Sequence, residues 1–184
     1  MSIKLGDTVP NFDAETTEGA INFHEWIGDS WAILFSHPAD YTPVCTTELG
    51  RVQKIIPEFK QRGIKMAALS CDSVESHNGW INDIKAYNKL DSFDYPIIAD
   101  PDRKIANLYG MMDPAEIDAK GLPLTCRAVF VIGNDKWVPK ILIKSALYIF
   151  AFQKAQIVHF VPCHNRAQFW RNFACHWFAQ IDSD

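Results

Sequence analysis

A cysteine in the setting of a nucleophile stands at position 45, where a turn-rich loop meets a predicted helix. Free backbone N–H groups and the positive end of a helix dipole favour a thiolate over a thiol at such a position. Thr42 can place its hydroxyl beside the sulfur and donate to it or to a bound oxygen atom. Pro43 fixes its own φ and removes one competing donor. The pattern predicts Cys45 as an attacking thiolate.

The elements that must position this cysteine follow from hydrophobic periodicity. Residues 31–37 (WAILFSH) form an apolar run that predicts a buried strand, and the apolar spacing from Thr46 to Gln61 predicts a helix. A helix is also predicted over 74–89, with Trp80, Ile84 and Tyr87 on one face. Strands are further predicted at 64–70, 95–98 and 127–132, and a short helix at 102–109. This alternation indicates an α/β domain with a largely parallel sheet covered on both faces.

The loop sequence SHPADYTPVCTTELG resembles the active-site signature of the peroxiredoxins, Pro-x-x-x-Thr-x-x-Cys, through Pro38, Thr42 and Cys45. It is most similar to the one-cysteine, peroxiredoxin-6 type. Agreement continues through LGDTVPNF, ALSCDSVESHNGW, YPIIAD and LPLTCRAVFVIG, to about Lys136. The resemblance implies a thioredoxin-like fold, in which helices flank a central, mostly parallel β-sheet.

The resemblance also implies roles for individual residues. Arg127 corresponds to the catalytic arginine of the family, and Glu48 to the glutamate that hydrogen-bonds near it. Cys45 would attack a peroxide oxygen while Thr42 and Arg127 donate to the developing charge, giving a sulfenic acid. His37, beside Pro38, is expected at the mouth of the site, where it could tune Cys45 or contact the reductant.

The function implied is that of a thiol peroxidase in antioxidant defence and redox homeostasis. Its substrates would be hydrogen peroxide and organic or phospholipid hydroperoxides. An external thiol such as glutathione, or a glutathione transferase-like partner, would reduce the sulfenate. No cofactor is expected, and a homodimer is one possible assembly.

Three further residues match positions to which a phospholipase A2 activity is attributed in the peroxiredoxin-6 type: His24, Ser30 and Asp135. The segment Gly28–Ala32 resembles a G-x-S-x-G elbow, but it ends in alanine and precedes a strand instead of following one. A polar turn in which Ser30 only forms hydrogen bonds is the alternative interpretation.

The other four cysteines are not expected to react. Cys71 and Cys126 are predicted in core strands. Cys163 and Cys175 are each followed by histidine, but this spacing does not match a tetrahedral metal site, so no metal is expected. A resolving cysteine usually stands in a Val-Cys-Pro context in this family, whereas residues 161–163 read Val-Pro-Cys. One-cysteine chemistry is therefore predicted, without a stable disulfide.

Composition and charge restrict the possible partners. With 184 residues the chain is about one domain long, and its net charge of -4 and pI near 5.8 make nucleic acid and anionic membranes poor partners. No basic region followed by an apolar run opens the sequence, so a cytoplasmic location is expected. The run at 145–153 is far shorter than the ~20 residues that a membrane helix needs.

The composition changes after Lys136. Residues 137–184 contain only two acidic residues and are rich in aromatic side chains, which predicts a peroxiredoxin domain over 1–136 and an atypical tail over 137–184. The strand, the arginine-bearing helix and the separate C-terminal domain expected of the family after Asp135 are not recognised in this tail. An altered reading frame or 3′ end is one hypothesis. A catalytically impaired variant, acting as a redox-sensing or partner-binding protein, is the alternative to an active peroxidase.

Overall fold

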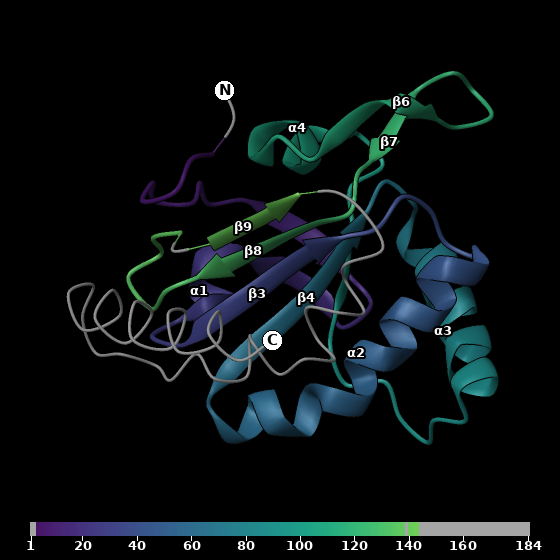
Figure 1. Ribbon diagram of the computed structural model, residues 1–184, viewed down its shortest axis with the longest axis horizontal. Helices are drawn as coiled ribbons and strands as arrows, with labels where there is room; N and C mark the ends of the chain where they lie inside the picture. Colours follow the sequence, from purple (N-terminus) through teal and green to yellow (C-terminus); the bar gives the residue numbers. More distant parts are fainter. Residues whose placement is uncertain (1–2, 139, 144–184) are drawn as a thin grey trace, which may run out of the picture.

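The computed structural model describes residues 3–138 and 140–143 (Figure 1). Within them, seven strands form one sheet in the order β2-β1-β5-β4-β3-β8-β9, and β6 and β7 form a separate hairpin. The strands are β1 (Asp13–Thr16), β2 (Gly19–Asn22), β3 (Trp31–Ser36), β4 (Ile64–Ser70), β5 (Ile97–Ala99), β6 (Met112–Ile117), β7 (Pro123–Thr125), β8 (Ala128–Ile132) and β9 (Lys140–Ile143). The helices are α1 (Phe23–Ile27), α2 (Pro43–Gln61), α3 (Val74–Asn88) and α4 (Lys104–Tyr109).

The sheet is mixed. Its centre, β3-β4-β5, is parallel because α2 and α3 serve as crossover connections between these strands. The hairpins β1-β2 and β8-β9, the β1-β5 pair and the β3-β8 pair are antiparallel. The prediction of a mostly parallel sheet is therefore wrong for the outer strands. Local hydrophobic periodicity identifies a buried strand such as β8 but not its direction.

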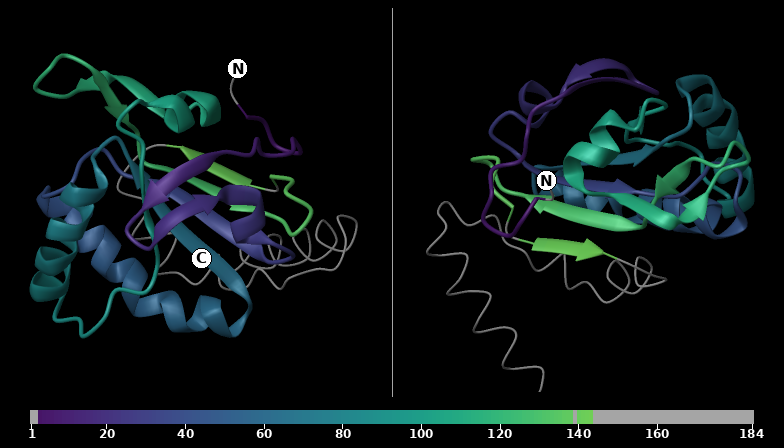
Figure 2. Two further views of the ribbon diagram at one scale, coloured as in Figure 1. Left: turned by 180° about the vertical axis from the view of Figure 1, so that it is seen from behind. Right: turned by 90° about the horizontal axis from the view of Figure 1, so that it is seen from above.

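Helices cover both faces of the sheet, as Figure 2 shows from two further sides. Side chains alternate between the faces along β3: Ile33 and Phe35 pack with α2 and α3, whereas Ala32 and Leu34 pack with α1 and α4. All six residues of β3 are consequently buried. The loop that leads to Cys45 leaves the end of this buried strand, which gives it a rigid starting point.

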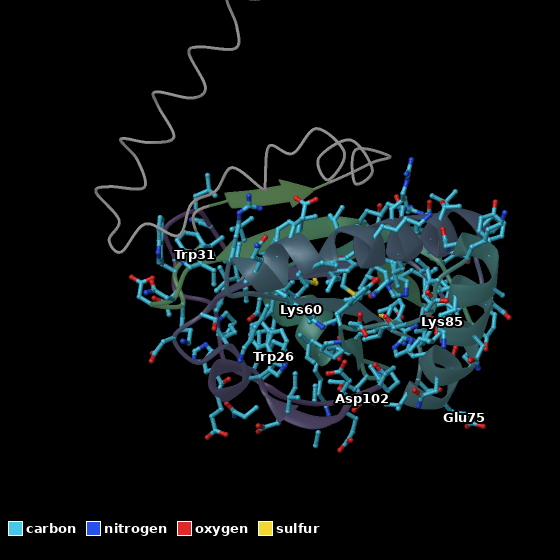
Figure 3. The ribbon with its side chains drawn as sticks, turned by 90° about the horizontal axis from the view of Figure 1, so that it is seen from below. Trp26, Trp31, Lys60, Glu75, Lys85 and Asp102 are labelled. Carbon is cyan, nitrogen blue, oxygen red and sulfur yellow. The ribbon has the colours of Figure 1, made fainter. Side chains whose placement is uncertain are left out.

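The helices α2 and α3 lie side by side on one face, and Figure 3 shows α2 across the sheet with Glu75 and Lys85 marking α3. Asn88 of α3 fits against Gly50 of α2, where a Cβ atom would lie 2.1 Å from the amide. The same amide donates to the carbonyl oxygen of Thr46 at 2.9 Å. This close approach fixes α3 against the first turns of α2.

Most predicted elements of the central region are confirmed, with small shifts at their ends. The strand at 64–70 has the predicted bounds, and the helices predicted at 46–61 and 74–89 correspond to α2 and α3. Tyr87, predicted on the same helix face as Trp80 and Ile84, has an exposed side chain. The buried face of α3 instead carries His77, Trp80 and Ile84, which follow one another at helical spacing.

The sheet continues beyond the predicted domain boundary at Lys136. Trp137 and Val138 are buried, and β9 pairs antiparallel with β8, with Val129 opposite Leu142. The expectation that no strand follows Asp135 is therefore wrong, because the backbone of β9 forms a hairpin with β8. The remainder of the predicted tail, 144–184, lies outside the described residues. Among the residues described, no helix combines the length and apolar character that crossing a membrane requires.

Candidate active site

Cys45 lies in the first turn of α2, which begins directly after the loop from β3. Thr42 is the N-cap residue with extended backbone angles, and Pro43 occupies the first helical turn. The Thr42 hydroxyl does not cap the helix; it donates to the carbonyl oxygen of Ala39 at 3.1 Å, and its interaction with Cys45 lowers the pKa of that thiol. Cys45 itself has no solvent exposure. A peroxide that approaches the sulfur would therefore meet the partly exposed side chains around it.

Arg127 provides the second contact to the sulfur. Its Nη2 donates to Cys45 Sγ at 3.4 Å, and its Nε donates to Glu48 Oε2 at 3.0 Å. The Glu48 side chain is only 2% exposed, whereas that of Arg127 is 23% exposed. Glu48 thus fixes one edge of the planar guanidinium and leaves the other edge facing the sulfur and solvent.

The backbone around Arg127 is held by Ser36, the last residue of β3. The buried Ser36 hydroxyl donates to the carbonyl oxygen of Cys126 at 2.7 Å and accepts from the N–H of Ala128 at 3.2 Å. These two bonds span Arg127 on both sides. Ser36 therefore orients Arg127 and also stands where the loop to Cys45 begins. This role of Ser36 was not predicted from the sequence.

Several opposing influences act on the Cys45 thiol. Burial raises the pKa of Cys45 above its ordinary value, while the hydrogen bond with Thr42 and the charge of Arg127 lower it in part. The sequence analysis considered the groups that favour a thiolate but not the burial of the sulfur, which acts against them and has the larger effect on the pKa of Cys45. The thiolate fraction near neutral pH depends on Thr42 and Arg127.

This balance predicts a large effect of the Thr42 hydroxyl. In Thr42→Val the pKa of Cys45 should rise further, because a group that favours the thiolate is lost. Alkylation of Cys45 at pH 7 should slow roughly 10- to 100-fold, which corresponds to the free energy of one hydrogen bond to a charged group. Thr42→Ser keeps the hydroxyl and should resemble the wild type. The pH dependence of iodoacetamide labelling, read at the Cys45 peptide, measures both. An unchanged pKa in the valine variant would contradict the assignment.

The structure places His37 behind the loop instead of at the mouth of the site. Its side chain is 1% exposed, its Nε2 bonds Asp40 Oδ1 at 3.0 Å, and its ring lies 5.1 Å from that of Trp80. Contact with a reductant is therefore excluded for His37 in this conformation. Pro38, which follows it, is half-buried where the loop begins. Asp40 also bonds His77 of α3, and neither residue was singled out from the sequence.

The three residues matched to a phospholipase activity make the contacts of ordinary turns. His24 Nε2 bonds the carbonyl oxygen of Val9 at 3.0 Å, and the backbone N–H of Ser30 closes the turn after α1. Asp135 Oδ1 accepts from the backbone N–H of Trp137 at 3.4 Å. Within residues 3–138, His24 and Ser30 share no hydrogen bond, so the serine is not paired with a base. The polar-turn interpretation of Ser30 fits these contacts.

The other described cysteines lack the surroundings of Cys45. Cys71 is half-buried in the bend after β4, and burial raises its pKa to about 11. Cys126 is buried between β7 and β8, so neither residue lies within a strand as predicted. Cys163 and Cys175, and with them the question of a resolving cysteine, lie outside the described residues.

Comparison with known families and proteins agrees with this geometry. The model of the AhpC/TSA family matches residues 5–141. Peroxiredoxin-6 of Gallus gallus and that of Homo sapiens are each 58% identical over 135 residues, which are 72% of this chain and 60% of the relative. The chain thus spans about three fifths of the length of these curated relatives.

Two solved structures extend the likeness to three dimensions. A crystal structure of the C45S mutant of peroxiredoxin 6 from Arenicola marina has a TM-score of 0.77 and 42% identity, covering 97% of this chain and 76% of that one. A yeast mitochondrial 1-Cys peroxiredoxin, described with glutathione/thioredoxin systems, has a TM-score of 0.69 and 40% identity, covering 84% and 78%. The likeness confirms the predicted thioredoxin-like α/β fold.

Proposed function

We propose that this chain, which belongs to the AhpC/TSA family and is a peroxiredoxin, reduces hydrogen peroxide and organic hydroperoxides through Cys45. The observation that carries the proposal is the contact of Arg127 Nη2 with Cys45 Sγ at 3.4 Å. This contact gives the sulfur a fixed cationic donor, and Thr42 adds a hydroxyl on the helix side. Such an arrangement favours a thiolate nucleophile and stabilises negative charge that develops on the peroxide.

The proposed reaction is a displacement at oxygen. The Cys45 thiolate attacks one oxygen of the peroxide, so that an S–O bond forms as the O–O bond breaks. The departing alkoxide or hydroxide takes a proton from solvent and leaves as an alcohol or water. Cysteine sulfur is oxidised to sulfenic acid and the peroxide is reduced. Thr42 and Arg127 donate to the oxygen atoms as charge builds on them, and the sulfur needs no cofactor for this two-electron change.

An external thiol is the proposed reductant of the sulfenate. Cys45 and Cys126 belong to core clusters on opposite faces of the sheet, and Cys71 lies in the bend after β4, so internal reduction has no evident route among the described cysteines. The yeast relative described with glutathione/thioredoxin systems supports a small thiol or a thiol protein in this role. Glutathione is the reductant that we propose for this chain.

Treatment with one equivalent of peroxide tests both the site and the one-cysteine chemistry. Without added thiol, the intact protein should gain one oxygen atom, and sulfenate trapping with peptide mapping should place it on Cys45. Excess peroxide should advance the same residue to sulfinate, and glutathione added earlier should restore the thiol. Equal labelling of Cys71 would contradict the site. A disulfide from Cys45 to Cys163 or Cys175 would contradict the one-cysteine mechanism.

A further inference from the structure

The loop between β3 and α2 is held from the outside by the first two turns of α3. Asp40, in the middle of the loop, accepts hydrogen bonds from His77 Nδ1 and from Ser76 Oγ, both at 2.7 Å. Tyr41 donates from its hydroxyl to the carbonyl oxygen of Ser76 at 3.3 Å. Two consecutive loop residues are thereby bound to consecutive residues of one helix, directly before Thr42.

Asp40 lies between two imidazole rings. His37 Nε2 bonds its Oδ1 at 3.0 Å, opposite the His77 contact to Oδ2, and all three side chains are at most 2% exposed. Burial by itself would raise the pKa of Asp40, but the hydrogen bonds and charges of both histidines lower it well below its usual value. The carboxylate therefore stays ionised and accepts from both rings.

This network is difficult to explain by stability alone. His37 Nδ1 and His77 Nε2 are buried without a hydrogen-bond partner among the described residues. Buried polar atoms without partners destabilise a fold, and a buried ionic group is often less stabilising than apolar side chains of the same volume. Such a network is better explained by the geometry that it imposes on the loop.

The loop contains backbone strain that such a network can hold in place. Tyr41 has φ of 57°, in the left-handed region that non-glycine residues rarely adopt. Its hydroxyl lies so close to α3 that a Cβ atom at Gly79 would be 2.5 Å away. Strained conformations persist where surrounding contacts determine them, and they often occur at functional sites. Released from α3, the Tyr41 peptide would relax and move Thr42 with it.

We propose that His77 is a positioning residue of the active site, which acts through Asp40 to hold Tyr41 and Thr42 so that the Thr42 hydroxyl stays beside Cys45. The inference rests on the proposed function of Cys45. His77 touches neither the sulfur nor the peroxide. Its contribution is the Nδ1–H donor that fixes the Asp40 carboxylate against α3.

His37, Asp40 and His77 could also be considered as metal ligands, because their nitrogen and oxygen atoms lie within 4.8 Å of one another. The hydrogen-bond geometry argues against that interpretation. Each imidazole bonds a different oxygen of Asp40, at 2.7 and 3.0 Å, so the carboxylate bridges the two rings. Metal ligands instead converge on one point about 2.0–2.2 Å from each of them. The observed separations are those of N–H···O hydrogen bonds.

The test compares His77→Leu with His77→Asn. Leucine removes the donor, whereas the asparagine amide can donate from nearly the position of Nδ1. In His77→Leu, peroxide reduction should slow roughly 10- to 100-fold, the range expected when a reacting group is misplaced by about 1 Å. The pKa of Cys45 should rise as in Thr42→Val. In His77→Asn, both quantities should lie near the wild-type values.

A double variant separates positioning from general support of the fold. If His77 acts through Thr42, then His77→Leu combined with Thr42→Val should be no slower than Thr42→Val alone. Multiplied effects would overturn the proposal, and so would a lower melting temperature with an unchanged pKa of Cys45. Loss of wild-type activity on treatment with a chelator would also overturn it, since it would assign the residues to a metal.

Two outcomes of this test require a further variant or measurement. If His77→Leu does not fold, Ser76→Ala removes one bond to Asp40 from a partly exposed residue, and it should raise the pKa of Cys45 in the same direction by a smaller amount. No shift in that variant would count against the proposal. If the wild type reduces no peroxide, the proposed function fails, but the pKa of Cys45 still reports on His77 because alkylation requires no peroxide.

Discussion

In Cys45→Ser, the rate of peroxide consumption should fall to that of the uncatalysed reaction with the remaining thiols. Serine retains the size and position of the side chain, but its hydroxyl is far less nucleophilic than a thiolate, and it cannot form the sulfenic acid. The contacts of Arg127 and Thr42 remain available, so the fold and its melting temperature should be nearly unchanged. The measurement is peroxide loss with glutathione in excess.

Cys71→Ser is the matched control. Cys71 lies in the bend after β4, and its high pKa keeps it as a thiol near neutral pH. This variant should consume peroxide at the wild-type rate. If Cys45→Ser retained that rate, or if Cys71→Ser lost it, the assignment of the nucleophile would be wrong.

Arg127→Lys should reduce the rate of peroxide reduction by roughly 100-fold or more, the usual effect of removing a donor to developing negative charge. Lysine keeps the charge but not the planar group that bonds Glu48 from Nε and Cys45 from Nη2 at the same time. A lysine ammonium drawn to Glu48 would leave the sulfur without this donor. Stopped-flow measurement of sulfenate formation isolates this step from reduction by thiol.

Arg103→Lys provides the same chemical change at another site. Arg103 pairs with Asp118 at 2.7 Å, next to the β6-β7 hairpin, and it does not contact Cys45. The rate of sulfenate formation should be unchanged in this variant. A wild-type rate in Arg127→Lys, with unchanged circular dichroism, would show that charge without the planar geometry is sufficient.

The sequence predicted the centre of the fold well, because short, mainly apolar runs such as 64–70, bounded by turn residues, favour buried strands. The strands β1 and β2 were missed, since each has four residues, most of them partly or fully exposed, and neither contains an apolar run. β9 was missed because the change of composition after Lys136 suggested a boundary. The antiparallel direction of β8 is set by tertiary pairing with β3, which no local pattern contains.

The site was predictable in part for a similar reason. Thr42 and Cys45 lie within one local motif, so their proximity follows from sequence spacing. Asp40 and His77 are 37 residues apart, and their contact depends on how α3 packs against the loop. A signal was nevertheless present: His77 precedes Trp80 by three residues and shares its helix face, which places a polar side chain among buried ones.

Cys45 belongs to the same packed core cluster as Phe35, Leu49 and Trp80, and this position couples its oxidation state to the folding equilibrium. Each oxygen atom added to the sulfur occupies volume where the neighbouring side chains already touch, and overpacking of a core typically destabilises it by about 1–3 kcal/mol. A sulfinate adds a buried negative charge beside Arg127, whose own charge is already paired with Glu48. Progressive oxidation should therefore loosen the start of α2, so that the free energy of unfolding decreases as exposure to peroxide increases.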